Sequence, residues 1–200
     1  MNTKVSHSGQ NDKIGLRRTQ ERLVKAMGRN RQVQETAKLV DFLGSWVESR
    51  NFEVVLATLP LPDEMDLTPF FASCLAQGRR VALARTFPGK TLGFLFVNSL
   101  EGPWDQRPFG LKEPLLTAPA WVPAPATLCL VPGLAFAPAS PQGAVRLGRG
   151  GGYYDRWLEI HGREVLSVGV GFSVQTVAHL PREEHDQLLD AWWDGFQLRR

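Results

Sequence analysis

The sequence predicts a single α/β domain with a mostly parallel central sheet and helices on both faces, of the Rossmann-like, doubly wound kind. Short buried apolar runs alternate along the chain with segments of helical periodicity, the pattern of parallel strands joined by crossover helices. The chain has 200 residues, of which 43% are hydrophobic and 22% charged, which suits one globular domain. We expect a polar, disordered tail over residues 1–11 and one domain over residues 12–200.

The first half of the domain is predicted to hold three helices and three strands. Apolar side chains three and four residues apart predict the helices, as Leu23 and Met27 do in the first of them, where Leu16 lies on the same stripe. The run FEVVLATL predicts a buried strand that ends before Pro60. In chain order, we expect helices over residues 13–27 and 32–50, a strand over 52–59, a helix over 66–77, and strands over 80–84 and 91–97.

The second half begins with a proline-rich segment, residues 101–126, which predicts a long covering loop. Ligands of open α/β sheets bind beyond the carboxyl ends of the strands. We therefore expect residues 59–64 and 132–136 to lie on the same side of the sheet as a later glycine-rich segment. The remaining predicted elements are strands over residues 127–131 and 165–172 and a helix over residues 153–161.

The cysteines and the hydropathy of the sequence indicate the cellular compartment of the protein. Cys74 and Cys129 lie far apart without metal or redox spacing, which favours core positions in a reducing compartment. No run of 18 apolar residues and no signal-peptide pattern is present, so we expect a cytoplasmic protein without a membrane partner. The four histidines do not cluster, and no Ser/His/Asp or Cys/His arrangement is evident.

Positive charge gathers at the start of the chain. Residues 1–31 carry eight Lys/Arg against Asp12 and Glu21, whereas the rest of the chain carries more acids than bases. A basic start on an acidic body suits an anion, either a nucleic-acid backbone or a small phosphorylated ligand, although a solvated helix face has the same composition. The chain offers no recognised nucleic-acid module, so we expect no nucleic-acid partner.

The most informative segment is RLGRGGGYYD, from Arg146 to Asp155. Its glycines let successive backbone N–H groups turn toward an anion, and the N-terminus of the following helix adds partial positive charge. Arg146 and Arg149 add forked donors suited to phosphate, and Asp155 follows closely enough to hold a cation against the same phosphates. The run matches neither the P-loop nor the dinucleotide pattern, so a glycine-rich turn without a ligand is the alternative.

Together with other motifs, this segment resembles the signature of the 5-formyltetrahydrofolate cyclo-ligases, also called methenyltetrahydrofolate synthetases. The resemblance covers roughly residues 13–190. Its other motifs are KIGLR at residues 13–17, Leu59 through Asp63-Glu64, FGLKEP at residues 109–114, PGLAF at residues 132–136, and Leu180-Pro181 with His185-Asp186 and Asp190.

The resemblance implies ATP- and Mg²⁺-dependent conversion of 5-formyltetrahydrofolate to 5,10-methenyltetrahydrofolate, with release of ADP and phosphate. ATP phosphorylates the formyl oxygen, and a second folate nitrogen closes on the activated carbon. This chemistry needs positioning and charge neutralisation more than a protein nucleophile, which agrees with the absence of a nucleophilic triad. We expect small-molecule partners only, ATP and the folate, and a monomer.

The family's ATP site, carried over to this sequence, begins on the predicted first helix. Lys13 and Arg17 lie four residues apart, so they share one helix face and can meet one phosphate chain. Lys13 and Arg149 are the implied catalytic residues, and Asp155 and Asp186 the implied Mg²⁺ ligands. The rest of the ATP site is Arg146, Leu147, Gly148, Arg149, Gly150, Gly151, Gly152, Tyr153 and Tyr154.

The implied folate site overlaps the ATP site. Glu64 is the expected acceptor for pterin N–H groups, although an acid there would also suit the start of a helix. Trp104 and Phe109 either add to the folate wall or cover the core. The other implied folate residues are Leu59, Arg149, Gly150, Gly151, Gly152 and Tyr153.

Three features depart from the family pattern. Residues 137–142 lack an Asp and lengthen the gap before Arg146, Ala84 replaces a Pro, and Trp192-Trp193 replaces smaller residues. They suggest a divergent member with shifted folate specificity. A non-catalytic folate or nucleotide binder, and an ATP-dependent ligase on another pterin, are the alternatives that the sequence leaves open.

Overall fold

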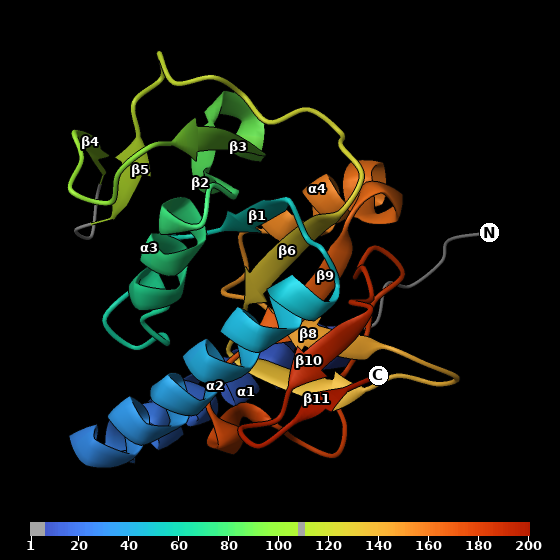
Figure 1. Ribbon diagram of the computed structural model, residues 1–200. Helices are drawn as coiled ribbons and strands as arrows, with labels where there is room; N and C mark the ends of the chain where they lie inside the picture. The colour runs from blue at the N-terminus through green and yellow to red at the C-terminus, as the bar shows by residue number, and fades with distance from the viewer. Residues whose placement is uncertain (1–6, 108–110) are drawn as a thin grey trace.

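The computed structural model describes residues 7–107 and 111–200, with backbone alone for residues 7–11. Within these ranges the centre of the molecule is a seven-stranded sheet (Figure 1). In spatial order its strands are β11 (Leu198–Arg199), β10 (Ala191–Trp193), β9 (Leu166–Val170), β6 (Thr127–Pro132), β1 (Val54–Ala57), β2 (Arg80–Phe87) and β3 (Thr91–Val97).

The sheet is mostly parallel. Strands β10, β9, β6, β1 and β2 run parallel to one another, and an antiparallel strand lies at each edge, β11 beside β10 and β3 beside β2. The inner strands are buried on both faces, as parallel sheets require. The predicted α/β class with a mostly parallel sheet is therefore confirmed.

Helices cover both faces of the sheet. Helices α1 (His7–Ala26), α2 (Arg29–Ser49) and α3 (Thr68–Ala76) contribute side chains to one hydrophobic cluster, which includes Val55 and Leu130 of the sheet. Helix α4 (Tyr153–His161) packs in the opposite cluster through Trp157, together with Val54 and Val131. Successive strand residues thus face opposite layers, which gives the predicted helix–sheet–helix arrangement.

The connections reverse direction between β1 and β6. From β1 the chain passes through α3 to β2 on one side, whereas from β6 it passes through α4 to β9 on the other. A reversal of this kind opens a crevice beyond the carboxyl ends of the two strands. Residues 58–64 follow β1 there, and residues 133–134 follow β6.

Several elements differ from the sequence prediction. Helix α1 begins at His7, so it includes the last residues of the predicted tail, and residues 1–6 lie outside the described ranges. The predicted loop over residues 101–126 contains the β4–β5 hairpin, and the unpredicted β7–β8 hairpin precedes the glycine-rich segment. These strands, of three or four residues, are β4 (Trp104–Gln106), β5 (Lys112–Pro114), β7 (Ala135–Pro138) and β8 (Ala144–Leu147).

The core of α2 provides a stability test. Leu43 is fully buried in the first cluster, and Val33 on the same helix is 55% exposed. We expect Leu43→Ala to lower the free energy of unfolding by about 2–5 kcal/mol, because it leaves a cavity in a packed core. Val33→Ala serves as the matched control and is expected to change stability by about 0.5 kcal/mol or less. Chemical denaturation of both variants measures the difference, and equal effects would contradict this description of the core.

Candidate active site

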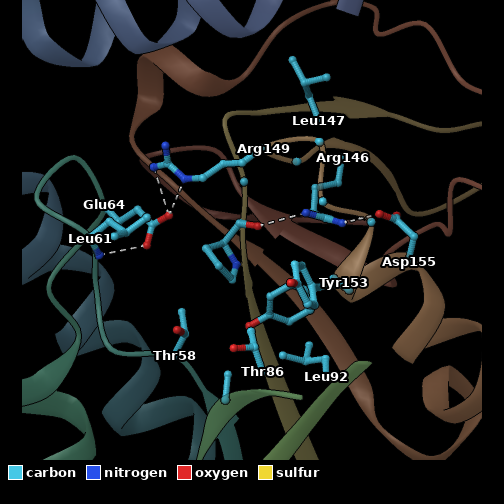
Figure 2. Close-up of a pocket in the computed structure, with 18 of the residues that line it drawn as sticks. Thr58, Leu61, Glu64, Thr86, Leu92, Arg146, Leu147, Arg149, Tyr153 and Asp155 are labelled. Carbon is cyan, nitrogen blue, oxygen red and sulfur yellow. Dashed lines mark hydrogen bonds and ion pairs between the residues drawn. The ribbon is translucent and has the colours of Figure 1, made fainter. Parts of the chain in front are cut away.

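A cavity of about 500 Å³ opens at the crevice between β1 and β6 (Figure 2). Its walls come from α1, the segment after β1, strands β2, β3 and β5, the glycine-rich segment and residues 183–186. The residues that the sequence analysis assigned to ATP, folate and metal all line it: Lys13, Arg17, Leu59, Glu64, Arg146, Leu147, Gly148, Arg149, Gly150, Gly151, Gly152, Tyr153, Tyr154, Asp155 and Asp186.

The glycine-rich segment joins β8 to α4. Gly150 and Gly152 have φ of +97° and +65°, in the left-handed region that side chains with a Cβ rarely adopt. Gly152 is the N-cap of α4, so the first N–H groups of that helix lack intrahelical acceptors beside the cavity. These features suit an anion at this end of the cavity.

Arg146 and Asp155 form a nearly buried ion pair at one end of the cavity (Figure 2). The Arg146 Nη2 atom lies 2.9 Å from Asp155 Oδ2, and the guanidinium stacks 5.4 Å from the centre of the Tyr154 ring. Burial raises the pKa of the Tyr154 hydroxyl well above its ordinary value. That hydroxyl has no partner among the described residues and is itself buried, so it stays protonated at neutral pH.

Helix α1 brings Lys13 and Arg17 to the same cavity, as their spacing predicts. The Lys13 Nζ atom lies 2.5 Å from Asp186 Oδ2 and 3.3 Å from Glu183 Oε2. Arg17 Nε donates to the carbonyl oxygen of Gly148 at 2.9 Å. Two cations of one helix therefore connect the glycine-rich segment with the segment near residue 186.

Glu64 and Arg149 meet at the opposite end of the cavity (Figure 2). Arg149 donates to Glu64 Oε1 from Nη2 at 3.2 Å and from Nε at 3.3 Å, and Leu61 N donates to Glu64 Oε2 at 3.1 Å. Burial raises the pKa of Glu64 above its ordinary value of 4.5, although Leu61 and Arg149 oppose the shift. An acid and a base thus form the wall where the folate is expected.

The two expected metal ligands line one cavity, but each contacts a cation. Asp155 pairs with Arg146, and Asp186 pairs with Lys13. Within the described chain, Asp186 groups with Glu183 and His185, whose ligand atoms lie within 4.8 Å of one another, and Asp155 is not in that group. Mg²⁺ takes few carboxylates and completes its shell with water and phosphate oxygens, so this donor set fits it when a phosphate chain is present.

Sequence reasoning missed the wall formed by β2, β3 and β5. Thr86, Leu92 and Glu113 line the cavity there. Thr86 donates to Glu113 Oε1 from N at 3.0 Å and from Oγ1 at 2.6 Å, and Arg107 Nε lies 2.8 Å from Glu113 Oε2. Glu113 stands in the FGLKEP motif, which was the available signal.

The aromatic and cysteine predictions have mixed outcomes. Trp104 packs against the first hydrophobic cluster and does not line the cavity of the described residues, so it covers the core. Phe109 lies outside the described residues. Cys74 and Cys129 are buried core residues, as predicted. Burial raises the pKa of the Cys74 thiol to about 11, so little thiolate forms at neutral pH.

Sequence comparisons place the chain among known relatives. It is 28% identical over 143 residues to the 5-formyltetrahydrofolate cyclo-ligase of Haemophilus influenzae. The aligned region covers 70% of this chain and 74% of that protein. It is 37% identical over 82 residues to the enzyme of the same name from Mycolicibacterium smegmatis, with 39% of each chain covered. None of the helices within the described ranges combines the length and hydropathy needed to cross a membrane.

Solved structures agree with the sequence relatives. The NMR structure of Aquifex aeolicus 5,10-methenyltetrahydrofolate synthetase matches with a TM-score of 0.77 and 28% identity, covering 94% of this chain and 92% of that one. The Mycoplasma pneumoniae 5,10-methenyltetrahydrofolate synthetase shares the fold, with a TM-score of 0.71, 19% identity, and 90% and 97% of the chains covered. The sequence model of the 5-formyltetrahydrofolate cyclo-ligase family matches residues 9–192, and this chain belongs to that family.

Proposed function

We propose that this protein is an ATP- and Mg²⁺-dependent 5-formyltetrahydrofolate cyclo-ligase that forms 5,10-methenyltetrahydrofolate, ADP and phosphate. The observation that carries the proposal is the cavity at the β1–β6 crevice, which gathers cations and helix N–H groups near one end and the partly buried carboxylate of Glu64 at the other. Membership of the family and the named relatives support the same activity.

The proposed reaction has two steps. The formyl oxygen attacks the γ-phosphorus of ATP, and the bond from that phosphorus to ADP breaks. The second folate nitrogen then attacks the activated carbon, the carbon–oxygen bond breaks with phosphate as the leaving group, and that nitrogen loses its proton. Both steps depend on alignment and on neutralised phosphate charge, which positioned residues can supply without a covalent intermediate on the protein.

The phosphate end of the site would use the cations that line the cavity. Lys13, Arg17 and Arg146 supply donors around the start of α4, and the glycine-rich backbone permits close approach of the phosphates. Asp155 and Asp186 would hold Mg²⁺, which neutralises phosphate charge when bound.

The folate end would use Glu64 and the glycine-rich segment. Ionised Glu64 has acceptor oxygens for the N–H groups of the pterin, and Leu59 and Tyr153 line the same cavity. Arg149 contacts Glu64 at this end and directly precedes the three glycines, where its forked donors can reach oxygens that become more negative during phosphoryl transfer. Catalytic roles for Arg149 and Lys13 are part of this proposal.

The test is the absorbance of 5,10-methenyltetrahydrofolate formed from 5-formyltetrahydrofolate, with and without ATP and Mg²⁺. We expect product only when both are present. No product from a folded protein that binds ATP would contradict the proposal. A monomeric state and a cytoplasmic location stay predictions, and light scattering tests the first of them.

A further inference from the structure

Asp63 contacts the site from outside the cavity wall. It is not among the described lining residues, yet its Oδ1 lies 2.7 Å from Arg149 Nη2. This is the shortest of the contacts that acids make with Arg149, since Glu64 Oε1 lies at 3.2 Å and Glu21 Oε1 at 3.8 Å. Asp63 therefore holds the guanidinium more closely than either of the other acids.

The segment that carries Asp63 is braced on both sides. Leu61 O accepts a hydrogen bond from Glu64 N at 2.9 Å, and Leu61 N donates to the Glu64 carboxylate. Pro60 and Pro62 flank Leu61 and fix their own φ angles. Arg149, in contrast, precedes three consecutive glycines, whose backbones have little intrinsic restraint. Asp63 is thus the fixed end of the pair.

Glu64 and Asp63 differ in whether a bound folate would compete with Arg149 for their carboxylate oxygens. Glu64 lines the cavity, so pterin N–H groups would compete with Arg149 for its oxygens. Asp63 stands outside the lining, so a ligand in the cavity would not compete for its contact with Arg149. A guanidinium that lost Glu64 without a second acid would have no close anionic partner, because Glu21 lies at 3.8 Å.

We propose that Asp63 is a positioning residue for the cyclo-ligase reaction, which holds Arg149 in place while Glu64 binds the folate. This inference rests on the proposed function. Arg149 is expected to act on charge that develops in phosphoryl transfer, so losing its orientation affects turnover more than nucleotide binding.

The first test compares Asp63→Asn with Glu21→Gln, a control that removes the more distant acid. We expect Asp63→Asn to lower kcat about tenfold, with the KM for ATP changed less than about twofold, because Arg149 loses alignment rather than charge. Glu21→Gln is expected to change kcat less than about twofold, since contacts between partly exposed groups at this distance contribute little. Asp63→Glu, which restores the carboxylate, should recover part of the loss.

A double-mutant cycle separates positioning from general damage. In an Arg149→Met background, Asp63→Asn is expected to change kcat less than about twofold, because its effect passes through Arg149. Equal losses in both backgrounds would overturn the proposal. A rise in kcat for Asp63→Asn would overturn it too, since Asp63 would then restrain the guanidinium rather than place it.

An NMR measurement keeps this test distinct from the test of the reaction. The ¹H–¹⁵N signal of Arg149 Nε, identified by its loss in Arg149→Met, is expected to move in Asp63→Asn and to stay in Glu21→Gln. An unmoved signal in Asp63→Asn overturns the positioning role even if the wild type is active. A wild type without product, with the signal moving as expected, overturns the proposed function and leaves Asp63 only a structural contact.

Discussion

Replacing Asp155 with alanine is expected to lower kcat by about a hundredfold, the size of effect seen when one preorganised electrostatic contact to a transition state is removed. Asp155 would hold Mg²⁺ against the phosphates, and it also pairs with Arg146 at 2.9 Å. Both contributions are lost in this variant. The absorbance assay, run over a range of Mg²⁺ concentrations, measures the change.

A stability measurement must accompany this result. The Arg146 side chain is only 5% exposed, so removing its acid leaves a buried charge without its partner, which costs about 3–5 kcal/mol in comparable cases. Asp155→Asn keeps the shape and an acceptor for Arg146, and it is expected to retain more stability while still losing most activity. Glu159→Ala, at an exposed position of the same helix, is the control. A folded Asp155→Asn variant with wild-type kcat and Mg²⁺ dependence would contradict the metal role.

Glu64→Gln is expected to raise the KM for 5-formyltetrahydrofolate about tenfold or more, which corresponds to the loss of about 1.4 kcal/mol of binding. An ionised carboxylate has two acceptor oxygens and no donor. An amide replaces one of these oxygens with an NH₂ group, which cannot accept a hydrogen bond from a pterin N–H group. The KM for ATP should stay near its wild-type value. Steady-state kinetics with each substrate varied in turn checks both statements, and an equal rise for both substrates would argue against a folate-specific contact.

The pH dependence follows from the environment of Glu64. Burial raises its pKa above 4.5, so the neutral acid, a poor acceptor for N–H groups, persists to higher pH than it does in the unfolded chain. The KM for the folate is expected to fall as pH rises through the raised pKa, because the carboxylate ionises there. Glu64→Gln should lose this dependence, and the KM for ATP over the same pH range is the control.

The raised pKa of Glu64 also determines how this residue changes the stability of the protein with pH. The folded protein holds the Glu64 proton at pH values where the unfolded chain has released it. The contribution of Glu64 to stability is therefore fully present below the unfolded pKa and is lost as pH rises through the folded pKa. Unfolding curves of wild type and Glu64→Gln across that window would reveal it.

The sequence predicted the α/β class because its long elements carry periodic patterns that need no tertiary contact to be recognised. The short hairpins carry no such pattern. Arg85 is buried against the β4–β5 hairpin, where it donates to Asp105 Oδ2 at 2.6 Å and to the carbonyl oxygen of Pro114. The proline-rich composition of residues 101–126 predicted a loop, and long-range contacts of this kind override that local preference.

The candidate site was predicted where local chemistry is dense and missed where it depends on contacts across the fold. The glycine-rich segment gathers its donors within ten residues, so its position by the cavity followed from sequence. Thr86 and Glu113 meet only because β2 and the β4–β5 hairpin pack together. Glu183 likewise joins the site through Lys13, which is 170 residues earlier in the chain.

The acids beside the phosphate end have a consequence for product release. Asp186 pairs with Lys13 and Asp155 pairs with Arg146, so each carboxylate competes with an incoming anion for its cation. A lone anion such as inorganic phosphate must displace these carboxylates, whereas a nucleotide that brings its own divalent cation gives them a new partner. Released phosphate and free ADP should therefore inhibit weakly, and the cavity should favour the metal-loaded triphosphate over the more abundant simple anions of the cell.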